Sequence, residues 1–240
     1  VAKSEMGKPM QPIPVWVGKA SGPTPDTAAN HLYQSAQQQV TFSQVNAFVF
    51  TQATLKHGLD RLVQALSHYR EVRYTPWIFA TNDNLEDVFQ KTPFFYLSPL
   101  NSVLHAPQEV YKQESLLEPL TYQDFLASYR EPGRTTLLPS LTTTRAYWKA
   151  GKQKKDLLMI NGAYAIYNEK FIKWFSENDL TGTRWMNDHT VRTPLLIRSQ
   201  GKPKATVSLE NPDVKVTPYV KNGEPTFNVH INLRGNIEES

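Results

Sequence analysis

The chain has 240 residues, of which 40% are hydrophobic and 20% are charged, a balance that indicates a folded protein and excludes a disordered tail. It contains no cysteine, which excludes disulfides, thiolate nucleophiles, iron–sulfur clusters and the usual structural zinc sites. The net charge of +4 is uneven, because residues 1–139 hold 11 Lys and Arg against 12 Asp and Glu, whereas residues 140–240 hold 15 against 10. No apolar run approaches the roughly 20 residues of a transmembrane helix, and no signal peptide is recognisable.

The first predicted elements alternate between helix and strand. A helix is expected at Pro25–Gln39, where Asp26 suits the positive end of the helix dipole. A buried strand at Val45–Phe50 precedes a helix at Gln52–Tyr69, whose apolar residues recur every three or four positions, and a strand at Tyr74–Ala80 follows. A strand, a helix and a strand of these lengths predict a βαβ unit with parallel strands.

Three shorter helices are expected next, at Asn82–Gln90, Ser98–Gln113 and Thr121–Glu131. From Leu137 onward the pattern favours strands, interrupted by one helix around Ser176–Met186. The expected strands are Leu141–Tyr147, Leu157–Tyr167, Phe171–Phe175, Thr193–Arg198, Ala205–Glu210, Val214–Val220 and Thr226–Leu233.

Two of the connections carry turn signals. Asn168-Glu169 is expected to turn between two strands, and Asn222-Gly223 favours a type I′ hairpin turn. The predicted fold is therefore of mixed α/β and α+β class. An N-terminal α/β domain with a βαβ unit is expected at residues 1–140, followed at residues 141–240 by a smaller domain with a mixed, mainly antiparallel sheet and one helix.

Motifs for chemistry are scarce. The common signatures for dinucleotides, phosphate, zinc, acyl transfer and calcium are missing from the sequence, so we predict no cofactor, no metal and no catalytic residue. Asp188-His189 could form an acid–base pair, but a turn at the exit of a helix is the favoured interpretation. Asp83, Glu86 and Asp87 could bind a cation, but the acidic first turn of a helix is favoured. An envelope-acting hydrolase that uses Asp188, His189, Asp83 and Glu86 remains an alternative, as does a module that binds a small molecule.

One basic segment with aromatic neighbours stands out as a contact surface. Tyr147-Trp148 precedes a cluster formed by Lys149, Lys152, Lys154 and Lys155. Acidic proteins, anionic lipid headgroups and nucleic acid would all suit such a charge, although a solvated hairpin turn is the favoured interpretation. Nucleic acid is not expected, because no alternation of basic and aromatic residues continues beyond the cluster. The candidate interaction residues are Tyr147, Trp148, Trp174 and Trp185, with core packing favoured for Trp174 and Trp185.

Several short motifs recur in the order of a known family. The segment from Gly162 to Trp174, followed by Gly182 and Trp185, resembles the Ger(x)C lipoproteins, the C subunits of spore germinant receptors. The runs Asp124-Phe125-Leu126, Pro132-Gly133-Arg134 and Pro225-x-Phe227 resemble further stretches of that family, as do Pro139 and Gly235-Asn236. Gln44-Val45 and Lys173 depart from its pattern.

The resemblance implies a function without catalysis. Members of the family are required for the response of spores to germinants, together with membrane-embedded A and B subunits, and have no accepted enzymatic activity. They are lipoproteins, tethered through an N-terminal diacylglyceryl-cysteine to the outer face of the spore inner membrane. That cysteine, the family's opening strand and its third domain are not recognisable here, so we expect a chain shortened at both ends.

Overall fold

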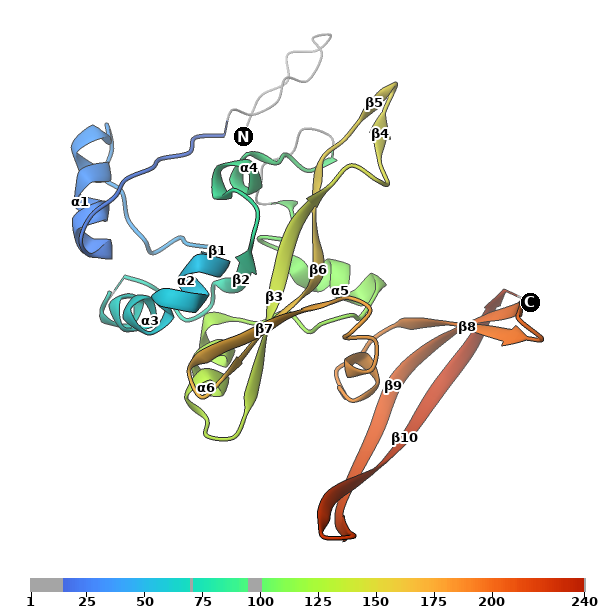
Figure 1. Cartoon of the computed structure of the whole chain (residues 1–240). Helices are drawn as coiled ribbons and strands as arrows, with labels where there is room; N and C mark the ends of the chain where they lie inside the picture. The colour runs from blue at the N-terminus through green and yellow to red at the C-terminus, as the bar shows by residue number, and fades with distance from the viewer. Residues whose placement is uncertain (1–14, 70, 95–100, 240) are drawn as a thin grey trace. The chain divides into compact units, whose positions relative to one another are not determined.

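The computed structural model describes residues 15–69, 71–94 and 101–239, which separate into two compact units (Figure 1). Unit 1 contains the described residues up to Ala106 together with Leu120–Trp174. Unit 2 contains Pro107–Pro119 and the described residues from Phe175 onward. The polypeptide therefore passes from one unit to the other three times.

Unit 1 is built on a five-stranded sheet with the order β1-β2-β3-β6-β7. Its strands are β1 (Ala47–Thr51), β2 (Trp77–Thr81), β3 (Thr135–Thr144), β6 (Leu157–Tyr167) and β7 (Lys170–Ser176). β1, β2 and β3 are parallel, whereas β6 is antiparallel to β3. The predicted parallel pair and the mixed α/β fold class are confirmed.

Both faces of this sheet are buried in hydrophobic clusters. On one face, Phe50 and Ile78 pack with Phe125 of α6 (Tyr122–Arg130) and with α2 (Gln52–His57) and α3 (Leu59–His68). On the other face, Phe79 packs with Leu104, close to α4 (Leu85–Gln90). Successive side chains of a strand point to opposite faces, so β2 supplies both clusters.

Most predicted helices are present but shorter than expected. The helix predicted at Gln52–Tyr69 is divided at Gly58, whose φ of −150° is not helical, because glycine has little preference for a helix interior. The first helix, α1 (Pro25–Ser35), has Ala36 as its C-cap, whose ψ of 127° is extended. α5 (Pro107–Gln113) is the C-terminal part of the helix predicted at Ser98–Gln113, of which residues 98–100 lie outside the described residues.

The third strand of the sheet also differs from its prediction. β3 begins at Thr135, six residues before the expected start at Leu141, and it ends at Thr144 instead of Tyr147. Pro139 lies within it, and a register shift follows between Ser140 and Leu141. A proline inside a run argues against a strand interior, which explains why the pattern placed the start too late.

Unit 2 contains a three-stranded antiparallel sheet with the order β10-β9-β8. β8 spans Thr193–Ser199, β9 spans Lys202–Lys221 and β10 spans Glu224–Glu239. The strands predicted at Ala205–Glu210 and Val214–Val220 are one strand, β9, in which Asn211 takes a positive φ of 48°. The predicted turn is confirmed, since Asn222 and Gly223 both have positive φ, 53° and 81°.

The helix predicted around Ser176–Met186 is wrong. The segment consists of turns and one short 3-10 helix, η3 (Thr183–Trp185). A capping arrangement is nevertheless present, because Ser176 N donates to Asp179 Oδ2 at 2.8 Å and Asp179 N donates to Ser176 Oγ at 3.3 Å. The hydroxyl of Thr181 then donates to the Asn178 carbonyl at 2.6 Å, and such local bonds compete with helix continuation.

The short segment Pro107–Pro119 is bound to the rest of unit 2 by hydrogen bonds around one buried serine. Ser115 N donates to the Arg192 carbonyl at 2.8 Å, and Ser115 Oγ accepts from Val191 N at 3.0 Å and Arg192 N at 3.1 Å. The guanidinium of Arg192 donates to the Gln113 carbonyl at 2.8 Å. These hydrogen bonds join two separate stretches of the sequence into one unit.

The predicted domain boundary at residue 140 differs from the division into compact units. Residue 140 lies within β3, which pairs with β6 along most of its length. The division into units falls after Trp174, next to the end of β7. A change from helical to strand pattern near residue 137 therefore marks the middle of a sheet and not its edge.

The core of unit 1 makes one stability prediction. Phe125 is fully buried, with its ring 6.3 Å from Phe50 and 5.3 Å from Tyr129 between centroids. Replacement Phe125→Ala should lower the free energy of unfolding by about 3–5 kcal/mol, measured by urea denaturation. The control Ile172→Ala, at a side chain that is 54% exposed, should change it by less than about 1 kcal/mol. Equal effects of the two changes would contradict this assignment of the core.

Candidate functional site

The acidic residues considered for a hydrolase stabilise local structure. Asp83 Oδ2 accepts hydrogen bonds from Thr142 Oγ1 at 3.0 Å and from Thr143 N at 2.9 Å, so it connects the loop after β2 to β3. Glu86 pairs with Lys19, with 2.7 Å between its Oε1 and the lysine Nζ. Both belong to unit 1, whereas Asp188 and His189 belong to unit 2. Each of these side chains is therefore accounted for by neighbours in its own unit.

His189 forms an exposed pair with a glutamate instead of a catalytic dyad. Its Nδ1 lies 2.7 Å from Glu118 Oε1, and Asn187 Nδ2 donates to the other oxygen of that carboxylate at 3.0 Å. The hydrogen bond and the charge of Glu118, with a smaller contribution from Asp188, raise the pKa of His189 above 6.5. The imidazole nitrogens therefore face carboxylates and not a nucleophile. No group of three metal-binding side chains exists among the described residues.

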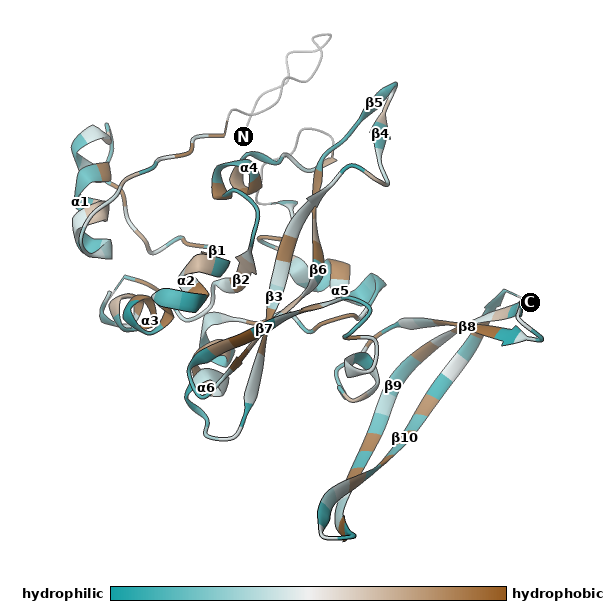
Figure 2. Ribbon diagram, viewed as in Figure 1, coloured by the Kyte–Doolittle hydropathy of each residue, from teal (hydrophilic) through white to brown (hydrophobic). Residues whose placement is uncertain are grey.

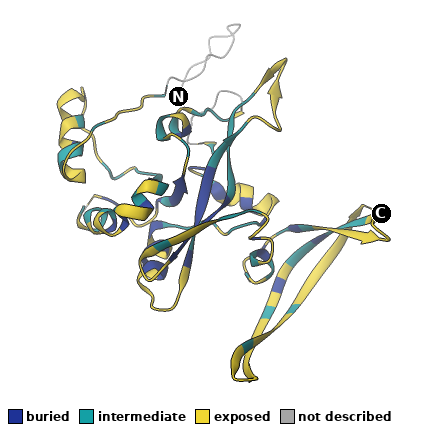
Figure 3. Cartoon of the chain, viewed as in Figure 1, coloured by how far each residue is buried: buried dark blue, intermediate teal, exposed yellow. Residues whose placement is uncertain are grey.

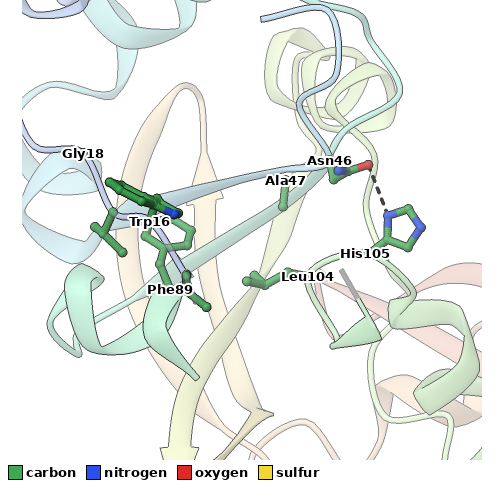
Figure 4. A pocket seen from close by; sticks show the side chains of 9 residues that line it. Trp16, Gly18, Asn46, Ala47, Phe89, Leu104 and His105 are labelled. Atoms are coloured by element: carbon green, nitrogen blue, oxygen red, sulfur yellow. Dashed lines mark hydrogen bonds between the residues drawn. The ribbon is translucent and has the colours of Figure 1, made fainter. Parts of the chain in front are cut away.

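A mainly apolar pocket of about 320 Å³ lies in unit 1 at the start of β1 (Figure 4). Trp16, Phe89 and Leu104 contribute its apolar walls. Asn46 and His105 form a polar edge, with 3.1 Å between Asn46 Oδ1 and His105 Nδ1. His105 is the one ionisable residue among the described lining.

The predicted interaction tryptophans at 174 and 185 are only partly accessible. Trp174 on β7 is 39% exposed, and its Nε1 donates to Ser140 Oγ at 3.0 Å, which ties β7 to β3 across the sheet. Trp185 lies in η3 and is half-buried. The hydrogen bond to Ser140 therefore fixes the indole of Trp174 against the sheet.

Tyr147 and Trp148 are far more accessible. Tyr147 is 73% exposed and Trp148 is 53% exposed, immediately before a small hairpin formed by β4 (Lys149–Ala150) and β5 (Gln153–Lys154). Trp148 meets Phe94 edge to face, with ring centroids 4.7 Å apart. Residues 145–154 are all exposed, as Figure 3 shows for this hairpin. We call residues 145–155 the basic hairpin.

A second surface was not identified from the sequence. Along the distal halves of β9 and β10, apolar and polar residues alternate (Figure 2), and the apolar side chains of both strands share one face. The exposed fraction reaches 75% at Val220 and 62% at Phe227. The sequence predicted strands at Val214–Val220 and Thr226–Leu233, but a local pattern does not show whether another element covers their apolar face. The apolar residues on this face are Val214, Val216, Pro218, Val220, Pro225, Phe227, Val229, Ile231 and Leu233.

Comparison with known protein families decides the relationship. The model described as the spore germination protein N-terminal domain matches residues 1–143, and the model described as spore germination B3/GerAC like, C-terminal, matches residues 161–240. The chain belongs to the Ger(x)C family. The two matches leave residues 144–160 uncovered. This stretch follows the predicted domain boundary and lies within the sequence of unit 1.

A solved structure agrees with this membership. The Ger(x)C chain is similar to the GerBC protein, whose crystal structure shares 17% sequence identity with it and gives a TM-score of 0.53. The similarity covers 85% of this chain and 56% of that one, so the chain spans little more than half of its relative. At this identity, the likeness shows the fold alone. No curated protein matches the chain significantly. In the described part of the Ger(x)C chain, no helix is long and apolar enough to cross a bilayer.

The pair formed by His189 and Glu118 predicts a pH dependence. A histidine whose pKa is raised by folding stabilises the folded state fully at a pH below the pKa that it has in the unfolded chain. This stabilisation is lost as the pH rises through the pKa that the histidine has in the folded chain. Replacement Glu118→Gln should move the pKa of His189 back toward 6.5, measured by NMR titration. Glu109→Gln, which removes a carboxylate that pairs with Lys112, is the control and should leave the titration of His189 unchanged. An unaltered pKa in Glu118→Gln would refute the pairing.

The role of Asp83 predicts a loss of stability. Replacement Asp83→Ala removes the acceptor for Thr143 N and for the Thr142 hydroxyl, so it should lower the free energy of unfolding by about 1–3 kcal/mol in urea denaturation. Asp87 is exposed in the first turn of α4, and the control Asp87→Ala should cost less than about 1 kcal/mol. Unchanged stability in Asp83→Ala would leave the carboxylate free for a role in chemistry.

Proposed function

We propose that this chain is the C subunit of a nutrient germinant receptor of spores, and that it acts by assembly with membrane-embedded A and B subunits and not by catalysis. The observation that carries the proposal is the match of two germination family models, in order, over residues 1–143 and 161–240. A match to one short motif would support only a shared fragment. Two consecutive matches support the family's role for the chain as a whole.

The contacts of the candidate acids and bases favour assembly over catalysis. Asp83 and Glu86 bind neighbouring groups within unit 1, and His189 is paired with Glu118 on an open surface. A general acid or base normally sits in a cleft whose environment shifts its pKa toward the working pH. The raised pKa of His189 comes from an exposed carboxylate, so its setting resembles a surface ion pair.

The proposed location is the outer face of the spore inner membrane. The polypeptide would be held there through an N-terminal diacylglyceryl-cysteine outside the present sequence, as the family relationship suggests. The diacylglyceryl group carries two acyl chains, which hold a protein at a bilayer much more firmly than one chain does. The A and B subunits would supply protein contacts beside the bilayer.

The four aromatic residues divide into two roles in this proposal. Tyr147 and Trp148 are exposed and belong to the basic hairpin, so we assign them to intermolecular contact. Trp174 donates a hydrogen bond to Ser140, and Trp185 is half-buried in η3, so we assign them to structural integrity. The assignment separates variants that affect contact from variants that affect folding.

The test is genetic and uses spores that carry the full-length subunit. Removal of the subunit should abolish the response to the germinant of its receptor, because the receptor needs all of its subunits, while germination by a nutrient-independent trigger should continue. Germination can be followed by the loss of optical density of a spore suspension. Wild-type germination after removal of the subunit would end the proposal.

Two single variants refine that test. Tyr147→Ala should slow germination without lowering the melting temperature of the purified chain, whereas Trp174→Ala should lower the melting temperature, because it removes a large half-buried ring and the bond to Ser140. A Tyr147→Ala variant with an equally lowered melting temperature would contradict the assigned roles.

A further inference from the structure

The basic hairpin has a defined backbone with an exposed cationic end. β4 and β5 form an antiparallel pair, and Lys155 N donates to the Trp148 carbonyl at 2.9 Å beyond them. Gly151 occupies the first position of the two-residue turn with a φ of 61°, which glycine adopts without strain. In Figure 1 the hairpin extends beyond the ends of β3 and β6. Its lysines are therefore presented by an ordered ribbon.

Two of these lysines are placed opposite each other. The register pairs Lys149 with Lys154, so two positive charges share one face of the ribbon. Like charges at directly opposed positions destabilise a strand pair. In the part of the chain that the structure describes, no ion pair involves Lys149, Lys152 or Lys154. The arrangement has an electrostatic cost that an anion from outside the chain would remove.

The one carboxylate at the base of the hairpin is already neutralised. Asp156 Oδ2 lies 2.9 Å from Lys91 Nζ and 3.2 Å from an Arg145 guanidinium nitrogen. The hydrogen bond from Lys91, supported by the bond from Arg145 and by both charges, lowers the pKa of Asp156 below its usual value of 3.8. Asp156 therefore fixes the base of the hairpin and does not compensate the lysines beyond it.

The aromatic residues beside this charge have an amphipathic character. Consecutive residues point to opposite faces, so Trp148 lies on the face away from the Lys149–Lys154 pair, where it contacts Phe94. Tyr147, at 73% exposed, places its ring in solvent next to the lysines. Tryptophan and tyrosine are enriched at the level of lipid headgroups, because one end of each ring system is apolar and the other is polar.

We propose that the basic hairpin binds the anionic headgroups of a phospholipid bilayer, as a second membrane contact of the chain. The inference rests on the proposed function, because it takes the chain to work beside a bilayer. Four of the five cations in residues 145–155 are lysines, which are compact point charges on flexible stems. Such charges suit a fluid layer of phosphates, whereas recognition of a fixed carboxylate on a protein favours the planar fork of arginine.

A lysine near an anionic membrane surface contributes about a fivefold gain in binding, so three lysines together contribute on the order of 100-fold. A contribution of this size would add to the attachment that the two acyl chains of a diacylglyceryl-cysteine already provide. The hairpin would also orient the chain, since it fixes one end of unit 1 against the surface.

The test is sedimentation of the purified 240-residue chain with vesicles of phosphatidylcholine alone or mixed with phosphatidylglycerol. The chain should bind the mixed vesicles and not the neutral ones, and binding should fall as salt is raised. Combined replacement Lys149→Gln, Lys152→Gln and Lys154→Gln should weaken binding on the order of 100-fold. Tyr147→Ala should weaken it by a smaller factor.

The matched control carries the same change of net charge elsewhere. Lys202→Gln, Lys204→Gln and Lys215→Gln remove three exposed lysines of β9. The affinity of this variant for the mixed vesicles should be within about threefold of that of the original chain. Charges further than a Debye length from the lipid surface are largely screened and contribute little to binding. An equal loss in both variants would overturn the proposal, because it would show attraction by net charge alone.

Two outcomes distinguish lipid binding from binding to an acidic protein surface and from the proposed receptor function. If the original chain fails to bind mixed vesicles, while the hairpin variant germinates poorly in spores, the hairpin contacts an acidic protein surface and the lipid proposal is overturned. If the vesicles bind as expected, but removal of the subunit leaves germination intact, the proposed receptor function fails and the headgroup contact stands. The sedimentation assay needs neither of the other subunits, so the two failures are distinguishable.

Discussion

Burial of both faces of β2 is the constraint on which unit 1 depends. Every side chain from Ile78 to Thr81 is at most 1% exposed, so the sheet needs a cover on each side. Phe125 of α6 supplies one cover and Leu104 supplies the other. Two parallel strands cannot be joined by a tight turn, so a long connection must run between them. These long connections contain the elements that cover the sheet. The same connection between β2 and β3 also carries residues 107–119 into unit 2.

Several ionisable side chains connect segments within each unit. Asp83 joins the loop after β2 to β3, and Asp156 holds the base of the basic hairpin between Lys91 and Arg145. Glu118 holds His189 and Asn187 in a turn-rich part of unit 2.

Local patterns predicted the elements that depend on neighbours in the sequence. The βαβ unit and the turn at Asn222-Gly223 are confirmed, because strand alternation and turn residues act within a few positions. The helix expected around Ser176–Met186 is absent, because side-chain hydrogen bonds such as that of Thr181 compete with the backbone hydrogen bonds of a helix. The bond between Trp174 and Ser140 and the place of residues 107–119 depend on contacts far apart in the chain, which no local pattern encodes. Lys149 and Lys154 were recognisable as a cluster, but their opposed register was not.

The discontinuity of unit 2 limits how relatives of this chain can exchange parts. The C-terminal family match begins at residue 161, yet the hydroxyl that receives Val191 N and Arg192 N belongs to Ser115. A hybrid chain that took only the matched C-terminal region from a relative would pair the amides of that relative with the original residues 107–119. Recombination that keeps unit 2 intact must therefore transfer two separate stretches of the gene together.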